Sequence, residues 1–384
     1  MLAKALAERG HEVTWWISDF VHRSKTYRAS GIINDPLLPP GVRVIGVHST
    51  PYARNISWQR IQYEKNYGIE LVRLAENESM PDMIVMGDPA LFFSRSILDY
   101  KEKIKCKLVL DVIDLWPELF TVALPKWLKP LSQLLFMPLY KRRRALVNAC
   151  DGVVAVSRDY LSAALFGQTK EMPNSVVYWG IDIDDYDTAE VNCKLDCELF
   201  EFRKKFKLTL IYAGTLGDAY DMNIIIAAIK RANKQNLPVG FIIAGDGPRK
   251  QDFVQMTEQY ASNLKFLGAL PATDIATIYR NGDVGLMTYV PGSTVAMPIK
   301  FFDYLAGGLV ILNSLERDVR EIMAATEIGL NYRPADLDDF MKNVEKLASD
   351  EDGLSRLKRN SRKLVENYHT KHQYNGFVDF VERV

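Results

Sequence analysis

The sequence predicts an α/β protein made of two Rossmann-like halves, each a doubly wound parallel sheet with helices on both faces. The chain has 384 residues, more than one ordinary hydrophobic core fills, which favours two domains of about 150–200 residues. Short aliphatic and β-branched runs alternate along it with segments of helical period. That alternation is typical of parallel sheets, whose strands are buried on both faces.

Six apolar runs in the first half are expected to be strands. A short amphipathic helix from Leu2 to a stop at Gly10 comes before the first of them. A Rossmann domain ordinarily begins with a strand and a glycine turn ahead of such a helix, so we expect the first strand of this domain to be missing. The expected strands are 13–17, 42–47, 83–86, 108–112, 153–156 and 176–178, with helices at 59–77, 90–100 and 128–148.

A polar stretch, residues 182–196, is the best candidate for a linker between the halves. We place the N-terminal domain at 1–185 and the C-terminal domain at 186–367, with a final helix, 368–384, packing back on the first domain. A ligand is expected in the cleft at the carboxyl ends of the strands. Strands of the second half are expected at 208–213, 240–244, 265–267, 284–287 and 310–312, and the chain from 334 on is helical and charged.

Charge and composition exclude several classes of function. Lys and Arg together number 48, as do Asp and Glu. The chain therefore lacks the overall basic excess that would indicate a nucleic-acid partner. The four cysteines have no partner pair at zinc-ligand spacing, and the histidines lack metal-ligand spacing. We therefore expect reduced thiols, no metal and no cofactor. No apolar stretch reaches the ~20 residues that a spanning helix needs.

Two glycine turns follow predicted strands of the second half. Backbone N–H groups in such turns suit a diphosphate, although a plain tight turn explains each one equally well. In the second turn, Arg249 opens toward the expected cleft and could contact a phosphate. The residues concerned are Gly214, Thr215, Leu216 and Gly217 in the first turn and Gly245, Gly247 and Arg249 in the second.

A third segment starts at Pro298 and predicts a turn, a helix and a strand. Lys300 and Asp303 are three residues apart and share one helix face. The carboxylate could accept hydrogen bonds from both hydroxyls of a ribose, and the ammonium could neutralise a phosphate. The alternative is a surface ion pair that is worth at most ~1 kcal/mol.

Taken in order, these segments resemble the donor half of GT-B glycosyltransferases, specifically the large retaining family four, and the resemblance covers nearly the whole chain. Within that family, the subgroup that adds sugars to lipid-linked intermediates of bacterial surface polysaccharides is the most similar. Its marks are Asp114-Leu115-Trp116-Pro117-Glu118, Ser18-Asp19-Phe20 with His22 and Lys25, and Pro298-Ile299-Lys300. The other family motifs are 155–158, 179–182, 244–248, 266–268 and 303–308.

The resemblance implies roles for particular residues. Asp303 should bind the ribose, the 214–217 turn should cradle the diphosphate, and Asp114 should lie in the acceptor-side loop facing the reaction centre. The family motif at Phe266, Leu267 and Gly268 should hold the base through backbone groups, as part of 266–270.

The sequence also departs from the family pattern. The first acid of the family pair, usually Glu, falls on Val295, and the second is Asp303 rather than Glu. The usual Arg and Lys of the diphosphate turn are Thr215 and Tyr220, and Ile113 stands where His usually precedes Asp114. The charge that stabilises the leaving group is therefore expected from Lys300 and Arg249, which with Asp114 are the catalytic candidates.

Two basic segments of the first half could contact the acceptor. One mixes aromatic, aliphatic and basic residues, the composition of a segment at an anionic membrane surface, although a core helix with a solvated basic end is the alternative. The other could bind an acceptor phosphate or be ordinary solvated charge. The membrane-facing candidates are Lys126, Trp127, Lys129, Arg142, Arg143 and Arg144; the acceptor-side candidates are His22, Lys25, Arg54, Asn55 and Arg60.

Together these features predict a retaining transfer of a hexose-type sugar from a nucleoside-diphosphate sugar to a polyprenyl-diphosphate-linked or other lipid-linked saccharide. The product would belong to O-antigen, capsule or exopolysaccharide synthesis, at the cytoplasmic face of the cell membrane. Because no carboxylate nucleophile is evident, front-face substitution is favoured. Two alternatives stay open: a non-catalytic subunit that binds a sugar nucleotide, and a nucleotide-sugar epimerase. A dehydrogenase is disfavoured because no Gly-x-Gly-x-x-Gly with a following acid is present.

Overall fold

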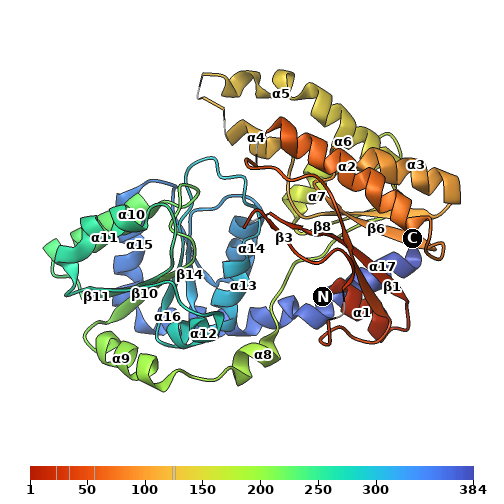
Figure 1. Cartoon of the computed structure of the whole chain (residues 1–384). Coiled ribbons are helices and arrows are strands. Elements are labelled where there is room, and N and C mark those ends of the chain that lie inside the picture. Colours follow the sequence, from red (N-terminus) through yellow and green to blue (C-terminus); the bar gives the residue numbers. More distant parts are fainter. Residues whose placement is uncertain (23, 34, 56, 123, 126) are drawn as a thin grey trace. The chain divides into compact units, whose positions relative to one another are not determined.

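The computed structural model describes residues 1–22, 24–33, 35–55, 57–122, 124–125 and 127–384. The chain divides into two units (Figure 1). Unit 1 is Met1–Tyr178 together with Gln373–Val384, and unit 2 is Trp179–His372. The domain boundaries expected from the sequence, after residues 185 and 367, fall inside unit 2 near its two ends.

Unit 2 is built on a six-stranded parallel sheet with the order β12-β11-β10-β13-β14-β15. Every residue of β10, β11, β13 and β14 is buried, because helices cover both faces of a sheet of this kind. This confirms the prediction of short, continuously apolar strands in this half. The strands are β10 (Leu208–Ala213), β11 (Val239–Ala244), β12 (Leu264–Gly268), β13 (Val284–Met287), β14 (Val310–Asn313) and β15 (Gly329–Asn331).

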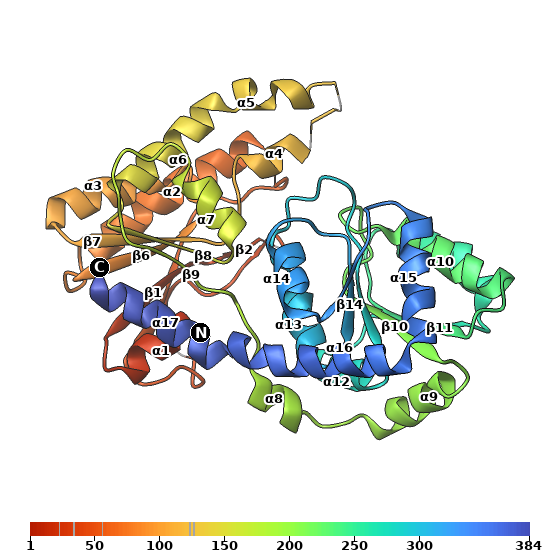
Figure 2. The ribbon, with the colours of Figure 1, turned by 180° about the vertical axis from the view of Figure 1, so that it is seen from behind.

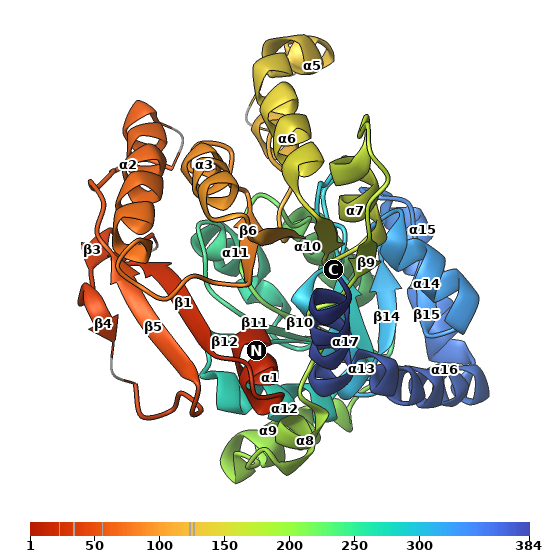
Figure 3. The same ribbon diagram turned by 90° about the vertical axis from the view of Figure 1, so that its right-hand side faces the viewer.

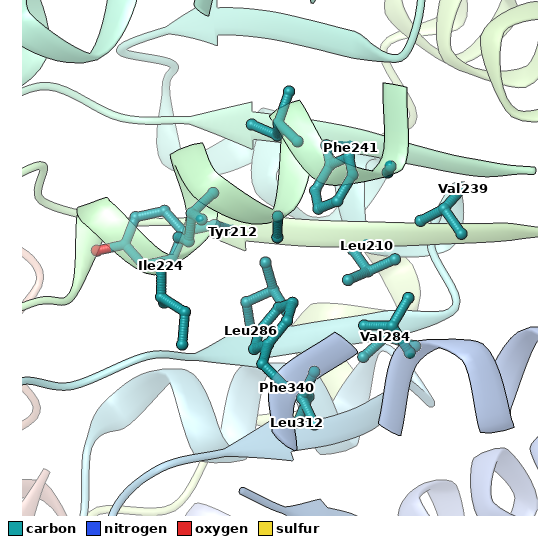
Figure 4. Close-up of a cluster of buried hydrophobic side chains, with 14 of the residues drawn as sticks. Leu210, Tyr212, Ile224, Val239, Phe241, Val284, Leu286, Leu312 and Phe340 are labelled. Carbon is teal, nitrogen blue, oxygen red and sulfur yellow. The ribbon is translucent and has the colours of Figure 1, made fainter. Parts of the chain in front are cut away.

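Helices α10, α11 and α15 lie on one side of this sheet, and α13 and α14 lie on the other (Figure 2). In the core, Tyr212 and Leu286 of the strands pack with Ile224 of α10 and Phe340 of α15 (Figure 4). Each such side chain contributes about 1.5–3 kcal/mol when fully buried. The helices are α8 (Ile183–Thr188), α9 (Cys193–Arg203), α10 (Met222–Lys234), α11 (Lys250–Thr257), η2 (Glu258–Tyr260), α12 (Ala272–Arg280), α13 (Ile299–Ala306), α14 (Asp318–Thr326), α15 (Leu337–Ser349), α16 (Glu351–Leu364) and η3 (Val365–Tyr368).

The strands of unit 1 form two larger sheets and one hairpin (Figure 3). One sheet has the order β1-β5-β4 with β4 antiparallel, the other is parallel with the order β6-β7-β8-β9, and β2 pairs with β3. Among the described strands, β1 pairs only with β5 and β6 only with β7, so no described strand joins the two sheets. The strands are β1 (Val13–Ser18), β2 (Phe20–Val21), β3 (Thr26–Tyr27), β4 (Gly31–Ile33), β5 (Val42–Val47), β6 (Met83–Asp88), β7 (Lys107–Val112), β8 (Gly152–Ala155) and β9 (Asn174–Val176).

The C-terminal helix α17 (Thr370–Arg383) packs on the β6–β9 sheet of unit 1. Phe377 and Phe380 pack there in one apolar cluster with Val109 of β7 and Val154 of β8. Arg9 adds an exposed ion pair with Glu382 at 2.8 Å. The other helices of unit 1 are α1 (Leu2–Glu8), α2 (Trp58–Ala75), α3 (Ser94–Ile104), α4 (Glu118–Val122), η1 (Lys129–Leu131), α5 (Ser132–Leu135), α6 (Met137–Ala149) and α7 (Arg158–Leu165).

Three sequence-based expectations about the elements were wrong. The single helix expected over 128–148 is three pieces, because Pro130 and Pro138 each stand in the first turn of a new segment, where the missing proline N–H costs nothing. The polar stretch 182–196 is no irregular linker, since it holds α8 and the start of α9, capped by Asp182 and Asn192. The last strand of the first half is Asn174–Val176 rather than 176–178.

Candidate functional site

The sheet of unit 2 reverses its winding at β10. The chain passes from β10 to β11 and β12 on one side, then returns to place β13 against the other side of β10. In open parallel sheets, ligands bind outside the carboxyl ends of the strands at such a reversal. The turn that follows β10 at Gly214 therefore lies at the expected ligand position.

The two glycine turns hold each other in place. A Cβ on Gly245 would lie closer than 3.0 Å to the Gly214 carbonyl oxygen, and a Cβ on Gly247 would crowd the Leu216 carbonyl oxygen in the same way. Both glycines also have φ near +150°, which L side chains rarely adopt. The Gly214 N–H donates to the Ala244 carbonyl at 3.0 Å, and the Leu216 N–H donates to the Asp246 carbonyl at 2.9 Å.

These hydrogen bonds determine which parts of the first turn can meet a phosphate. In the described chain the N–H groups of Gly214 and Leu216 are occupied, which leaves those of Thr215 and Gly217. In the described chain, no helix starts directly after this turn. Helix α10 begins only at Met222, and Asp221 already caps it by accepting from the Ile224 N–H at 3.1 Å.

Lys300 is the most unusual side chain of this site. Its ammonium is buried and has no hydrogen-bond acceptor among the described residues. Its Nζ lies 4.2 Å from the ring centre of Tyr212, 4.4 Å from that of Tyr220 and 5.7 Å from that of Tyr289. The same Nζ would lie 3.2 Å from a Cβ on Gly214. The ammonium is therefore held by cation–π contacts beside the turn.

Burial lowers the pKa of Lys300 to about 7, and Asp303 opposes this shift. Burial also raises the pKa of Asp303 to about 6, with Lys300 opposing. The two groups thus lie close enough to influence each other, as the spacing on helix α13 predicted. They are not the exposed surface pair that was the alternative. The preceding Pro298 gives α13 no side-chain cap, so the first N–H groups of this helix also lack a side-chain acceptor.

The remaining donor-side candidates lie near these turns but are already engaged. The Arg249 guanidinium donates to Asp252 at 3.2 Å and to Asn223 at 3.1 Å, and lies 3.7 Å from Asp218. The Gly268 carbonyl accepts from the Gly245 N–H at 2.7 Å. Phe266 packs on Phe253, with ring centres 5.5 Å apart, and Leu267 is half-buried. Arg249 as a phosphate contact and 266–270 as the base site stay predictions.

In unit 1 the acceptor-side loop brings together a group of carboxylates. Burial raises the pKa of Asp114, whose Oδ1 accepts from the Leu115 N–H at 2.9 Å. Asp88, which was not among the predicted site residues, is fully buried at the end of β6, and one of its carboxylate oxygens has no partner among the described residues. Burial, with Asp114 and Glu118 adding to it, raises the Asp88 pKa to about 6. A carboxylate ending an otherwise apolar run was the available signal.

Four of the five acceptor-side candidates meet around one tyrosine. Lys25 and Arg60 both approach the ring of Tyr52, and His22 bonds to its hydroxyl. Asn55 accepts a hydrogen bond from Lys25 at 2.6 Å. The fifth candidate, Arg54, is exposed, and its carbonyl accepts a hydrogen bond from the Ser57 hydroxyl at 2.8 Å.

The membrane-facing candidates separate into two groups. Arg143 is buried; it bonds to Glu118 at 2.6 and 2.8 Å and to the carbonyls of Trp116 and Ala163. It is a structural residue, so its prediction as a surface contact was wrong. Lys126 lies outside the described residues. The exposed members are Trp127, Lys129, Arg142 and Arg144, with Leu131, Leu134, Leu135 and Met137 beside them in sequence.

No described helix combines the length and the hydropathy needed to cross a membrane. One group of possible metal ligands occurs in the described chain: ligand atoms of Asp182, Asp184 and His369 lie within 4.8 Å of one another. Asp182 caps α8 and Asp184 pairs with Lys371 at 3.1 Å, which accounts for both carboxylates. That no metal or cofactor is needed stays a prediction.

Comparison with known proteins places the donor-side residues within a known domain. Residues 207–350 match the family model described as glycosyl transferases group 1. The curated gpi3 subunit of phosphatidylinositol N-acetylglucosaminyltransferase from Schizosaccharomyces pombe is 27% identical over 118 residues, which is 30% of this chain and 25% of that protein. The chain thus matches about a quarter of the length of that relative.

Solved structures establish the fold. Sucrose-phosphate synthase from Thermosynechococcus elongatus superposes with a TM-score of 0.75 at 13% identity, over 100% of this chain and 91% of that one. The Anabaena protein HepE, solved in complex with UDP, gives a TM-score of 0.64 at 15% identity, over 89% of this chain and 86% of that one. The fold is therefore GT-B, as the sequence predicted.

Proposed function

We propose that the chain transfers a sugar from a nucleoside-diphosphate sugar, which it binds at the carboxyl ends of the unit 2 strands. The observation that carries this proposal is the Lys300 ammonium, which is buried beside the Gly214 turn and has no hydrogen-bond acceptor in the described part of the chain. A buried cation without a partner is costly, and a phosphate oxygen is the acceptor that it lacks. Lys300 also lies within residues 207–350, which match the group 1 glycosyl transferase model.

The leaving group of such a transfer is a nucleoside diphosphate, whose negative charge grows as the glycosidic bond breaks. Lys300 and the N–H groups of Thr215 and Gly217 are the donors available to stabilise that charge. Asp303, on the same helix as Lys300, is proposed to accept hydrogen bonds from the ribose. Following the resemblance, we propose retention of configuration, a hexose-type donor and front-face substitution.

Asp303→Ala is expected to lower the affinity for a nucleoside diphosphate by about 10- to 100-fold, because hydrogen bonds to a charged group contribute about 1.5–3 kcal/mol. Isothermal titration calorimetry with UDP and GDP measures this change. The control is Asp336→Ala, which removes a different aspartate of unit 2, the N-cap residue of α15. Unchanged affinity in Asp303→Ala would refute the ribose role.

Turnover decides between this enzyme and the alternatives. The purified chain is incubated with nucleotide sugars and bacterial membranes, and nucleotide release is measured with and without membranes. We expect release that depends on the membranes. Binding without any turnover would favour the non-catalytic subunit. That alternative is motivated by the residues at three family positions: the usual acid is Val295, and the usual Arg and Lys are Thr215 and Tyr220. An altered nucleotide sugar formed without membranes would favour the epimerase.

We further propose a lipid-linked saccharide acceptor of bacterial surface polysaccharide synthesis, reached from the cytoplasmic face of the membrane. The exposed apolar residues from Trp127 to Met137 support membrane contact: Trp127 is 74% exposed, Leu134 65% and Leu135 50%. Lys129 and Arg142 add positive charge at this segment, and the combination suits an anionic lipid surface.

Leu134→Glu with Leu135→Glu is expected to reduce sedimentation with anionic vesicles by at least about tenfold, because inserting one leucine contributes about 1.5–3 kcal/mol. Arg143 must be left in place, since it is buried and paired with Glu118. The matched control is Ile32→Glu with Leu37→Glu, which changes two leucine-sized side chains that are 63% and 90% exposed elsewhere in unit 1. Equal sedimentation of the two double variants would contradict membrane contact through this segment.

A further inference from the structure

Three basic side chains of unit 1, those of His22, Lys25 and Arg60, converge on Tyr52. The Lys25 Nζ lies 4.2 Å from the Tyr52 ring centre and the Arg60 guanidinium carbon lies 4.9 Å from it. Arg60 Nη1 donates to the Tyr52 hydroxyl at 2.9 Å and lies 3.2 Å from His22 Nδ1. We call His22, Lys25, Tyr52 and Arg60 the Tyr52 cluster.

Aromatic packing and a tight turn fix the positions of Tyr52 and Lys25 in the cluster. Phe20 of β2 packs on Tyr52 with ring centres 5.0 Å apart, and Tyr63 of α2 does the same at 5.0 Å. Lys25 adopts a positive φ of 59°, and its N–H donates to the Val21 carbonyl at 2.8 Å. Positive φ is uncommon for a residue with a side chain, so the turn places Lys25 at an energetic cost.

The donors of the cluster are only partly used. Arg60 donates from Nε to Glu64 at 2.8 Å and from Nη1 to the Tyr52 hydroxyl, and Lys25 donates one N–H to Asn55. Because His22 Nδ1 faces the Tyr52 hydroxyl and a guanidinium, it acts as an acceptor, which leaves the Nε2–H as its donor. Among the described residues, Arg60 Nη2 and His22 Nε2 make no hydrogen bond, and Lys25 makes none beyond that to Asn55.

The charges of the cluster are also unbalanced. Glu64 is its one carboxylate in the described chain; it pairs with Arg60, and its Oε2 is buried without a partner. Partial burial and then Arg60 lower the pKa of both His22 and Lys25, with Lys25 adding to the effect on His22. Bringing an anion of charge near −2 to these donors would remove the repulsion and supply the missing acceptors.

We infer that the Tyr52 cluster binds a phosphate or diphosphate ester, and that this group belongs to the acceptor substrate. The assignment of the group to the acceptor rests on the proposed function, whereas the binding of a phosphate rests on the cluster alone. Lys25 supplies a flexible point charge, and the Arg60 Nη2 and His22 Nε2 donors fix the orientation of the anion.

Farnesyl diphosphate in neutral detergent micelles is the probe, titrated by calorimetry into the full chain carrying Lys300→Met, so that the unit 2 site does not compete. Lys25→Gln is expected to weaken this binding at least tenfold. Arg60→Gln combined with Glu64→Gln, which leaves no buried carboxylate unpaired, is expected to weaken it further. The control is Arg95→Gln, which removes an exposed cation of α3 whose partner is Asp99.

Each arm of the experiment separates one explanation from another. Diphosphate binding that is unchanged in both cluster variants overturns the inference. The same variants are also tested for binding to phosphatidylglycerol vesicles. If they lose vesicle binding as strongly as diphosphate binding, the cluster binds a lipid headgroup, and the assignment of the phosphate to the acceptor substrate is refuted. UDP binding to the chain with native Lys300 tests the proposed function independently. If the chain with native Lys300 fails to bind UDP but farnesyl diphosphate still binds, the donor site is refuted and the phosphate site at the Tyr52 cluster is retained. If farnesyl diphosphate fails to bind but UDP still binds, the phosphate site is refuted and the donor site is retained.

Discussion

Lys300→Met is expected to weaken UDP binding by at least about 100-fold and, at the same time, to make the folded chain more stable. The loss follows from two or more charge-assisted hydrogen bonds to the diphosphate, at about 1.5–3 kcal/mol each. The gain follows from removing a buried ammonium that has no hydrogen-bond acceptor in the described chain. Methionine has nearly the same shape, so the three surrounding tyrosine rings keep their packing.

The competing effect is the attraction between the ammonium and the rings of Tyr212, Tyr220 and Tyr289. Cation–π contacts contribute about 2 kcal/mol when they are desolvated, and Asp303 adds attraction. The pKa of Lys300, lowered to about 7 by burial, indicates that desolvation outweighs the attraction of Asp303. We therefore expect the charge to be unfavourable for folding near neutral pH and to be of benefit only when a phosphate binds.

The pH dependence of stability tests the same balance. A lysine with a pKa near 7 when folded and about 10.4 when unfolded binds more protons in the unfolded state between these values. Stability of the native chain should therefore rise from pH 7 toward pH 10 by up to about 1.4 kcal/mol per pH unit through this group. Lys300→Met should lack that rise.

Urea unfolding at pH 7, 8 and 9 and UDP titrations measure these effects. Lys342→Met, which changes an exposed lysine of α15, is the matched control and should leave both the affinity and the pH profile unchanged. Lower stability of Lys300→Met at pH 7, together with unchanged UDP affinity, would show that the tyrosine rings hold Lys300 for folding alone.

The positions of the strands and of the glycine turns could be predicted because they depend on local pattern. The strands β10, β11, β13 and β14 are largely apolar runs, and the turns at Gly214 and Gly245 directly follow two of them. The short edge strand β15 (Gly329–Asn331) carries no such run and was not predicted. The placement of Lys300 and Asp303 on one helix face was also accessible, since it follows from their spacing of three. Their burial was not, because it depends on what the other elements place around them.

The surroundings of Lys300 could not be predicted because they come from distant segments. Tyr212 is the next-to-last residue of β10, Tyr220 follows the first glycine turn, and Tyr289 follows β13. Each alone looks like an ordinary core aromatic, and only the strand order brings the three rings together. Arg143 is the opposite case. It lies in a run of basic residues that suggests an exposed surface, yet it is buried and donates hydrogen bonds to Glu118 and two backbone carbonyls.

Gly245→Ala is expected to destabilise the chain by about 3 kcal/mol or more and to abolish UDP binding. The added Cβ would stand closer than 3.0 Å to the Gly214 carbonyl oxygen, and the residue has φ near +150°. Backbone atoms cannot move aside as a flexible side chain can, so the chain must either separate the two turns or strain both. Either outcome displaces the Thr215 and Gly217 N–H groups.

Gly268→Ala and Gly217→Ala separate the two causes of that effect. Gly268 has φ of 66° but no atom within 4 Å of an added Cβ, so alanine there should cost only the backbone penalty of about 1–2 kcal/mol. Gly217 has no positive φ, and an added Cβ would meet only the Thr215 side chain at 3.5 Å, so alanine there should be nearly neutral for folding. Urea unfolding should therefore give a loss that is largest for Gly245, smaller for Gly268 and smallest for Gly217. If Gly245→Ala lost no more stability than Gly268→Ala, the two turns could not be locked together, and the diphosphate would have to be held by Lys300 without them.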